Sequence, residues 1–193
     1  ASFLYTYPPV TLFFYNLFNQ TDYHTAFHIF LLVKCALLIG LVIFWRWAFL
    51  GPVGDSLFFL FCLLVFNSAV FTDLIAGNIN LVEQVLLWLA FFFYLKHRLV
   101  LFCVFVLLAA SFKMTPIFFV VLLLASDHPK KIHYFGCAAA IFLAYLFIQY
   151  LIYPEMFTGF VHNALTVVGE SGAVGASTEK FVKDLFALIS QLV

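Results

Sequence analysis

Long apolar stretches dominate this chain and leave few residues for a surface that faces water. Of its 193 residues, 66% are hydrophobic and 9% are charged, and the mean hydropathy is +1.12. A soluble domain is about a quarter charged. The nine basic and nine acidic side chains cancel, which leaves no basic field to hold nucleic acid. The composition predicts a polytopic membrane protein and excludes a soluble enzyme, a nucleic-acid binder and a disordered chain.

The apolar stretches predict a single all-α transmembrane domain, since an apolar helix of about 20 residues crosses a bilayer core of about 30 Å. The alternating pattern of a membrane barrel is absent from the sequence. The expected spans cover residues 26–50, 56–72, 80–95, 99–125 and 132–153. Residues 154–179 are expected to form an external loop, and residues 180–193 to begin another helix. Because the sequence starts at Ala1 rather than Met, we expect a partial chain that lacks its N-terminal part.

The loop charges distinguish two paths for residues 99–125, which Lys113-Met114-Thr115-Pro116 interrupts. A single crossing would place Lys130 and Lys131 opposite the other loop cations. A hairpin broken at Pro116 would gather all of them on one side: Arg46, Lys96, Arg98, Lys130 and Lys131. The positive-inside bias favours the hairpin, with that side cytoplasmic. Irregular backbone at membrane depth is tolerated beside protein or a water-filled cavity, so the hairpin predicts a cavity open to the outer side.

Under this topology the unusual polar residues gather on the outer side or in the cavity below it. They are Tyr7, Asp22, His24, Asp73, Asn78, Asn80, Lys113, Glu155 and His162. A lysine at membrane depth costs about 2.5–3.5 kcal/mol on insertion scales, so it needs a partner or a ligand. For Lys113, a cation beside a helix break, a lipid-linked phosphate is a suitable ligand. The alternatives are a snorkelling side chain or an ion pair with Glu83.

The start of the span over residues 80–95 carries two structural expectations. Asn80 is expected to cap the helix, with Glu83 completing a capping box. Asn80, Gln84 and Trp88 share one helix face, which suits either a sugar-binding vestibule or contacts between helices. The cysteines are widely spaced and no Cys/His cluster is present, so the sequence predicts no metal and no cofactor.

Three short motifs carry a resemblance to a known family. They are Tyr7-Pro8-Pro9, Gly77-Asn78-Ile79-Asn80 and Lys113-Met114-Thr115-Pro116, in that order. In order and spacing they resemble the membrane mannosyltransferases of glycosyltransferase family 87, in the GT-C superfamily. The resemblance implies a GT-C-like helix bundle with a broken or re-entrant helix pair. It also implies a polyprenyl-phosphate sugar donor, membrane lipids as surroundings and a lipid or glycan acceptor.

The resemblance also implies roles for residues and a location. The donor site would comprise Tyr7, Pro8, Pro9, Asn78, Asn80, Lys113 and Thr115, with Glu155 and His162 near the acceptor or in the external loop. The active site would face outward from a bacterial inner (plasma) membrane. The family's catalytic acid lies upstream of the Tyr-Pro-Pro element, outside these residues, so Asp73 and Asp22 are fallback acids only. The alternative functions are a transporter or flippase for a lipid-linked sugar, for which no internal repeat is found, or a structural membrane subunit.

Overall fold

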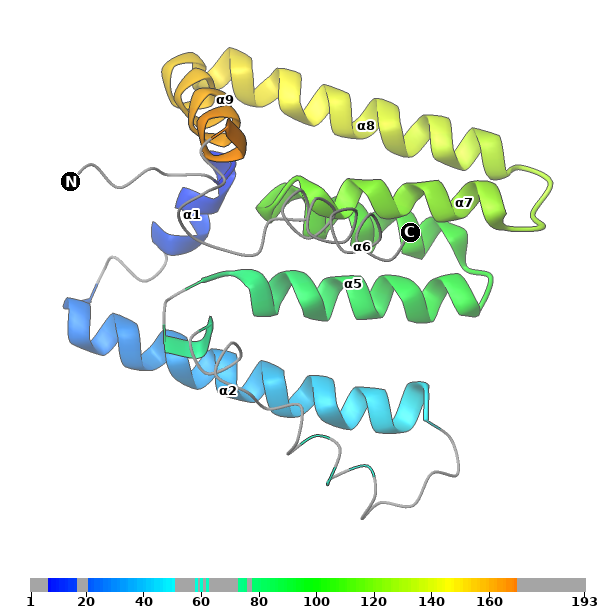
Figure 1. Cartoon of the computed structure of the whole chain (residues 1–193), viewed down its shortest axis with the longest axis horizontal. Helices are drawn as coiled ribbons and strands as arrows, with labels where there is room; N and C mark the ends of the chain where they lie inside the picture. The colour runs from blue at the N-terminus through cyan, green and yellow to red at the C-terminus, as the bar shows by residue number, and fades with distance from the viewer. Residues whose placement is uncertain are drawn as a thin grey trace, which may run out of the picture.

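The computed structural model describes residues 7–16, 21–50, 58, 60, 62, 73–75 and 78–169, and this part of the chain contains helices and no strand. Figure 1 shows the long helices stacked side by side, with two more helices across one end. The stack consists of α2 (Tyr23–Ala48), α5 (Asn80–Leu95), α6 (Leu99–Phe112) and α8 (Lys131–Ile152), and the crossing helices are α1 (Val10–Asn16) and α9 (Pro154–Gly169). Apart from residues 58, 60 and 62, the predicted span over 56–72 lies outside the described residues, as does the helix predicted from residue 180.

Two of these helices are long and apolar enough to cross a membrane. Helix α2 has 26 residues and α8 has 22. Helix α5 has 16 residues, which at about 1.5 Å per residue gives about 24 Å and falls short of a hydrocarbon core of about 30 Å. The assignment of the shorter helices to membrane crossings stays a prediction.

Residues 99–125 fold back on themselves. Helix α6 ends at Phe112, Lys113 is extended (φ −150°, ψ 130°), and the 3₁₀ helix η1 (Thr115–Val121) and α7 (Leu122–Ala125) follow. The returning segment reaches the far end of α5, where the Tyr94 hydroxyl donates to the Leu122 carbonyl at 2.9 Å. Pro116 lies in the first turn of η1, where its missing N–H costs no hydrogen bond. The chain therefore breaks at Lys113–Met114, ahead of Pro116.

The core lies where the hairpin packs between α5 and α8. Its buried members come from five elements: Ala90, Leu99, Phe102, Val106, Val120, Leu123 and Ala138. Ala109 and Ala110 of α6 are also fully buried. Lipid is as apolar as this core, so close packing through small residues, rather than exclusion of water, stabilises it.

The turn between α5 and α6 is closed by backbone hydrogen bonds. The His97 N–H donates to the Tyr94 carbonyl and the Arg98 N–H to the Phe93 carbonyl, both at 2.9 Å. His97, the residue after the Lys96 C-cap of α5, has a positive φ of 55°, the left-handed conformation that commonly follows a helix C-cap. The reversal therefore leaves His97 and Arg98 directly before the first turn of α6.

Residues 154–169 form helix α9, so the prediction of a loop is wrong over these residues. Pro154 and Glu155 occupy its first turn, where proline and an acidic side chain are both favoured. Phe160 is buried, and the ring of Phe157 lies 6.0 Å from that of Tyr150. Helix α9 thus folds against the end of α8 through its aromatic side chains.

Candidate functional site

A buried ion pair joins the middle of α2 to the segment that precedes α5. The Lys34 side chain is 0% exposed, and its Nζ lies 3.9 Å from Oδ2 of Asp73, whose side chain is 22% exposed. The same Nζ donates a hydrogen bond to the Asp73 backbone carbonyl. An unpaired charge in an apolar interior is costly. Asp73 therefore supplies both the countercharge and an acceptor that allow Lys34 to be buried.

Asp73 in turn binds Asn80. The Asn80 Nδ2 donates to Asp73 Oδ1 at 2.7 Å. The predicted capping role of Asn80 is therefore wrong: Ile79 is the N-cap of α5, and none of the described side chains caps this helix. A hydrogen bond to a carboxylate is about twice as strong as a neutral one, so the amide binds Asp73 instead of the helix end. The other amide atom, Oδ1, is buried and finds no hydrogen-bond partner among the residues that the structure describes.

One turn further along α5, Glu83 forms the second ion pair. Its buried side chain places Oε2 3.8 Å from Nζ of Lys113. The ion pair that the sequence offered as an alternative role for Lys113 is thus present, and the predicted capping box is not. The separation exceeds the roughly 2.7–2.9 Å of a charge-assisted hydrogen bond, and the Lys113 side chain is 43% exposed. Lys113 therefore remains accessible to a ligand.

Tyr7 completes the cluster from the N-terminal side. Burial raises the pKa of Tyr7, and the negative charges of Asp73 and Glu83 raise this pKa further, so the phenol lies near both carboxylates. The following turn is fixed, because the Thr11 hydroxyl donates to the Pro8 carbonyl at 2.7 Å. From α8, the Gln149 Oε1 accepts a hydrogen bond from the Val10 N–H at 3.2 Å.

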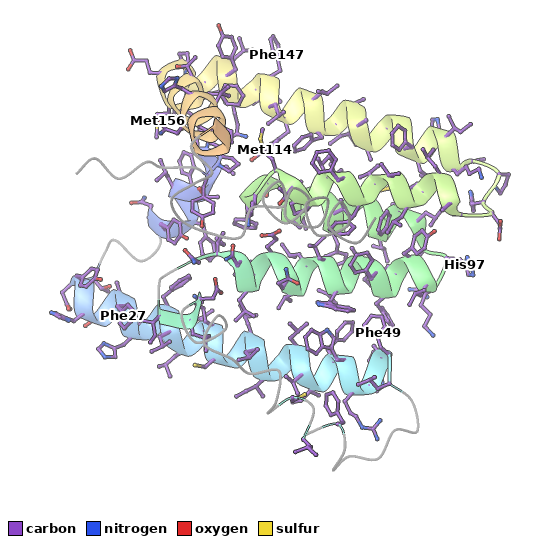
Figure 2. All side chains as sticks on the ribbon, viewed as in Figure 1. Phe27, Phe49, His97, Met114, Phe147 and Met156 are labelled. Atoms are coloured by element: carbon purple, nitrogen blue, oxygen red, sulfur yellow. The ribbon has the colours of Figure 1, made fainter. Side chains whose placement is uncertain are left out.

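The three sequence motifs therefore meet at one polar cluster. We call it the mixed-charge cluster, and its members are Tyr7, Lys34, Asp73, Asn80, Glu83 and Lys113. It lies where α5 begins and α6 ends. In Figure 2, Met114 is labelled at this end of the hairpin and His97 at the other.

A cavity of about 480 Å³ adjoins the cluster between α2 and α5. It is lined by Leu38, Leu41, Trp45, Asp73, Leu74, Asn80, Leu81, Gln84 and Trp88. The predicted stripe of Asn80, Gln84 and Trp88 thus faces this cavity. The Trp88 and Trp45 rings meet edge to face at 5.1 Å. An aromatic wall beside amide and carboxylate groups can stack on a sugar ring and bind its hydroxyls.

Several of the other predicted site residues are exposed. Asp22 is the exposed N-cap of α2, and hydrogen bonds from Thr25 hold the pKa of its carboxyl below the ordinary value. Glu155 and His162 are exposed on α9. The remaining predicted donor-site residues lie close to cluster members in the chain. Asn78 is half-buried just before α5, Pro8 and Pro9 are buried before α1, and Thr115 is exposed at the start of η1. Gly77, from the second motif, lies outside the described residues.

Lys34 is the residue that the sequence argument missed. Its signal was present, because a cation inside the apolar span predicted over residues 26–50 has the same insertion cost as Lys113. The partner was not readable from the sequence, since Asp73 lies 39 residues away.

These observations define a helical membrane protein with paired charges in its interior and a polar cluster at one end of a helical hairpin. A model of glycosyltransferase family 87 matches residues 5–192. The chain belongs to this family and is therefore a membrane glycosyltransferase. Comparison with curated proteins and with solved structures gives no match.

Proposed function

We propose that this protein transfers a sugar from a polyprenyl-phosphate donor to a lipid or glycan acceptor on the outer face of a bacterial inner (plasma) membrane. The sugar would be mannose or a similar hexose or pentose. Family membership supports sugar transfer, and the identity of the donor and acceptor is our proposal. The observation that carries it is the position of Lys113, which is half-exposed at the helix break and paired with Glu83. Glu83 lies near Tyr7 and one turn along α5 from Asn80.

Lys113 would bind the phosphate of the donor, with Tyr7, Asn78 and Asn80 around the sugar and Pro8, Pro9 and Thr115 shaping the site. The charges of Lys34, Asp73, Glu83 and Lys113 cancel, so a phosphate has to draw one cation away from its carboxylate. Lys34 is fully buried against Asp73. Lys113 is the cation that can move toward a phosphate, because its side chain is 43% exposed and water can solvate it.

The chemistry also needs a base to deprotonate the acceptor and a cation to stabilise the departing phosphate. Lys113 supplies the cation. Asp73 is a poor base, since its Oδ1 accepts from Asn80 and its Oδ2 faces Lys34. Asp22 is exposed and caps α2. Neither fallback acid suits the role, and the resemblance implies a catalytic acid upstream of Tyr7.

The test compares Lys113→Ala with Lys96→Ala, a matched control in which the exposed lysine lies at the opposite end of the hairpin. Both variants of the full chain are assayed in membranes supplied with a polyprenyl-phosphate sugar. Loss of one preorganised charge donor costs about 10²–10³-fold in rate, so Lys113→Ala is expected to lose that much kcat, whereas Lys96→Ala keeps wild-type turnover. Near-normal turnover by a well-folded Lys113→Ala protein would remove Lys113 from the donor site.

The orientation of the hairpin has a separate test. With the four native cysteines replaced, Asp127→Cys places one thiol in the connection between α7 and α8. If this connection is cytoplasmic, a membrane-impermeant maleimide labels it in inverted vesicles and not in intact cells. Labelling from outside would contradict the proposed topology and leave the Lys113 assignment to its own assay.

A further inference from the structure

A second polar site lies at the other end of the hairpin, between the α5–α6 turn and the connection from α7 to α8. It is a cavity of about 300 Å³ lined by His97, Arg98, Leu99, Val100, Leu101, His128 and Tyr134. We propose that this pocket binds the phosphate of an anionic phospholipid head group. The proposal does not depend on the sugar-transfer chemistry, because Lys113 lies at the opposite end of α6.

Two side chains supply donors suited to phosphate. Arg98 is exposed and forms no salt bridge with any residue that the structure describes. Its planar guanidinium can bind two phosphate oxygens at once. His128 Nδ1 accepts a hydrogen bond from the Lys130 N–H at 3.1 Å, so its proton resides on Nε2, which becomes a second donor. The ring of Tyr134, 5.4 Å from that of His128, supports the imidazole.

The backbone adds to the pocket's affinity for an anion. The first turn of α6 contributes Leu99, Val100 and Leu101 to the lining, and N–H groups in the first turn of a helix lack acceptors within the helix. Within the described part of the chain, no side chain caps this helix terminus. The left-handed His97 turns the chain so that Arg98 stands beside these N–H groups. Guanidinium, imidazole and helix dipole thus all favour negative charge at one place.

An apolar track identifies a lipid rather than free phosphate as the occupant. Val100, Val104 and Leu108 are all exposed and recur every four residues, so they form one row along α6 that starts at the pocket. The row is about 12 Å long at 1.5 Å per residue, which suits an acyl chain. The further cations at this end, Lys96, Lys130 and Lys131, attract anionic lipid to the surface.

The experiment measures binding to the purified full chain in neutral detergent, with short-chain phosphatidylglycerol, phosphatidylcholine and inorganic phosphate as probes. Phosphatidylglycerol is expected to bind at least about tenfold tighter than phosphatidylcholine. Arg98→Gln is expected to weaken phosphatidylglycerol binding by about tenfold or more, which corresponds to the loss of one charge-assisted hydrogen bond. The matched control is Lys130→Gln, an exposed cation at the same end that does not line the pocket, and it should leave the affinity within about twofold. Lys113→Ala should bind as the wild type does.

Other outcomes would overturn the proposal. Equal losses in Arg98→Gln and Lys130→Gln would show attraction to surface charge and no pocket. Inorganic phosphate that binds as tightly as phosphatidylglycerol would assign the pocket to the free anion. If Arg98→Gln does not fold, Arg98→Lys serves instead, because it keeps the charge and loses the bidentate hydrogen bond to phosphate. Unchanged affinity for phosphatidylglycerol in Arg98→Lys would also refute the assignment. Val104→Asn, in the exposed apolar row along α6, should weaken phosphatidylglycerol binding and leave the binding of inorganic phosphate unchanged.

Discussion

The two ends of the hairpin handle charge in opposite ways. Where α5 begins and α6 ends, each cation faces a carboxylate, Lys34 with Asp73 and Lys113 with Glu83. Where α5 ends and α6 begins, the loops carry an excess of cations, and Asp127 is the sole acidic residue between Lys96 and Lys131. Figure 2 marks these two ends by Met114 and His97.

Burial accounts for the difference. Lys34 is completely enclosed, and in a medium of low dielectric constant a charge needs a countercharge within the protein. Lys96 and Arg98 are exposed, so water and lipid phosphates can compensate their charge. The mixed-charge cluster therefore depends on its own residues, whereas the cationic end depends on its surroundings. Substitutions that unpair a buried charge in the mixed-charge cluster should destabilise the protein more than substitutions at the cationic end.

The largest effect on stability is expected from Asp73→Ala, which leaves the buried Lys34 without its carboxylate. Removing one partner of a buried pair costs about 3–5 kcal/mol. The measurement is the free energy of unfolding in mild detergent, with Lys96→Ala as a control. Lys34→Met combined with Asp73→Ala removes both charges and should recover most of the loss. If the double variant is as unstable as Asp73→Ala, the cost does not arise from an uncompensated charge.

At the cationic end a neutral hydrogen bond holds the hairpin to α5. Tyr94→Phe removes the hydroxyl that donates to the Leu122 carbonyl. A typical hydrogen bond contributes about 1 kcal/mol, and the expected loss of unfolding free energy is of that size. Tyr23→Phe, at a residue that is 78% exposed, is the matched control and should leave the unfolding free energy unchanged. A loss like that of Asp73→Ala would mean that the two ends do not differ as described.

Glu83→Gln tests the half-exposed pair of the mixed-charge cluster. Since water can solvate Lys113, loss of the carboxylate should change the unfolding free energy by less than about 1 kcal/mol. Under the proposed function the freed Lys113 binds donor phosphate more tightly, so KM for the donor should fall in the same variant. A rise in KM would indicate that Glu83 orients Lys113 rather than competing for it.

The sequence predicted the broken helix over residues 99–125, and it gathered Tyr7, Asn80 and Lys113 on one side. Lys113 ahead of Thr115-Pro116 signals the break locally, whereas the gathering on one side was inferred from the loop cations and the topology that they favour. The hydrogen bonds and ion pairs within the cluster could not be predicted from the sequence. Whether Asn80 caps α5 or binds a carboxylate depends on where Asp73 lies in space. Lys34 shows the same limit, since its contact depends on how the helices pack.

Helix α9 shows a different failure. The glycines and polar residues after Tyr153 favoured a loop, and they outweighed the start signal given by Pro154 and Glu155. Phe157 and Phe160, three residues apart, mark one helix face. In α9 the sequence contains a helix signal, but the glycines and polar residues around it obscured that signal. In the mixed-charge cluster no local sequence pattern indicates which residue pairs with which.

The smallest effect is expected from Asp22, the exposed N-cap of α2. Hydrogen bonds from Thr25 lower its pKa below the ordinary value of 3.8. A depressed pKa in the folded state adds stability above the unfolded-state pKa, and this stability is lost as the pH falls through the folded-state pKa. Asparagine caps a helix about as well as aspartate, so Asp22→Asn should lose only this pH-dependent part. Thermal midpoints measured from pH 7 to pH 3 should therefore converge for wild type and Asp22→Asn below pH 3.8, whereas Asp22→Ala, which lacks the cap, stays lower throughout. A constant offset between wild type and Asp22→Asn would show that the Asp22 charge adds nothing to the cap.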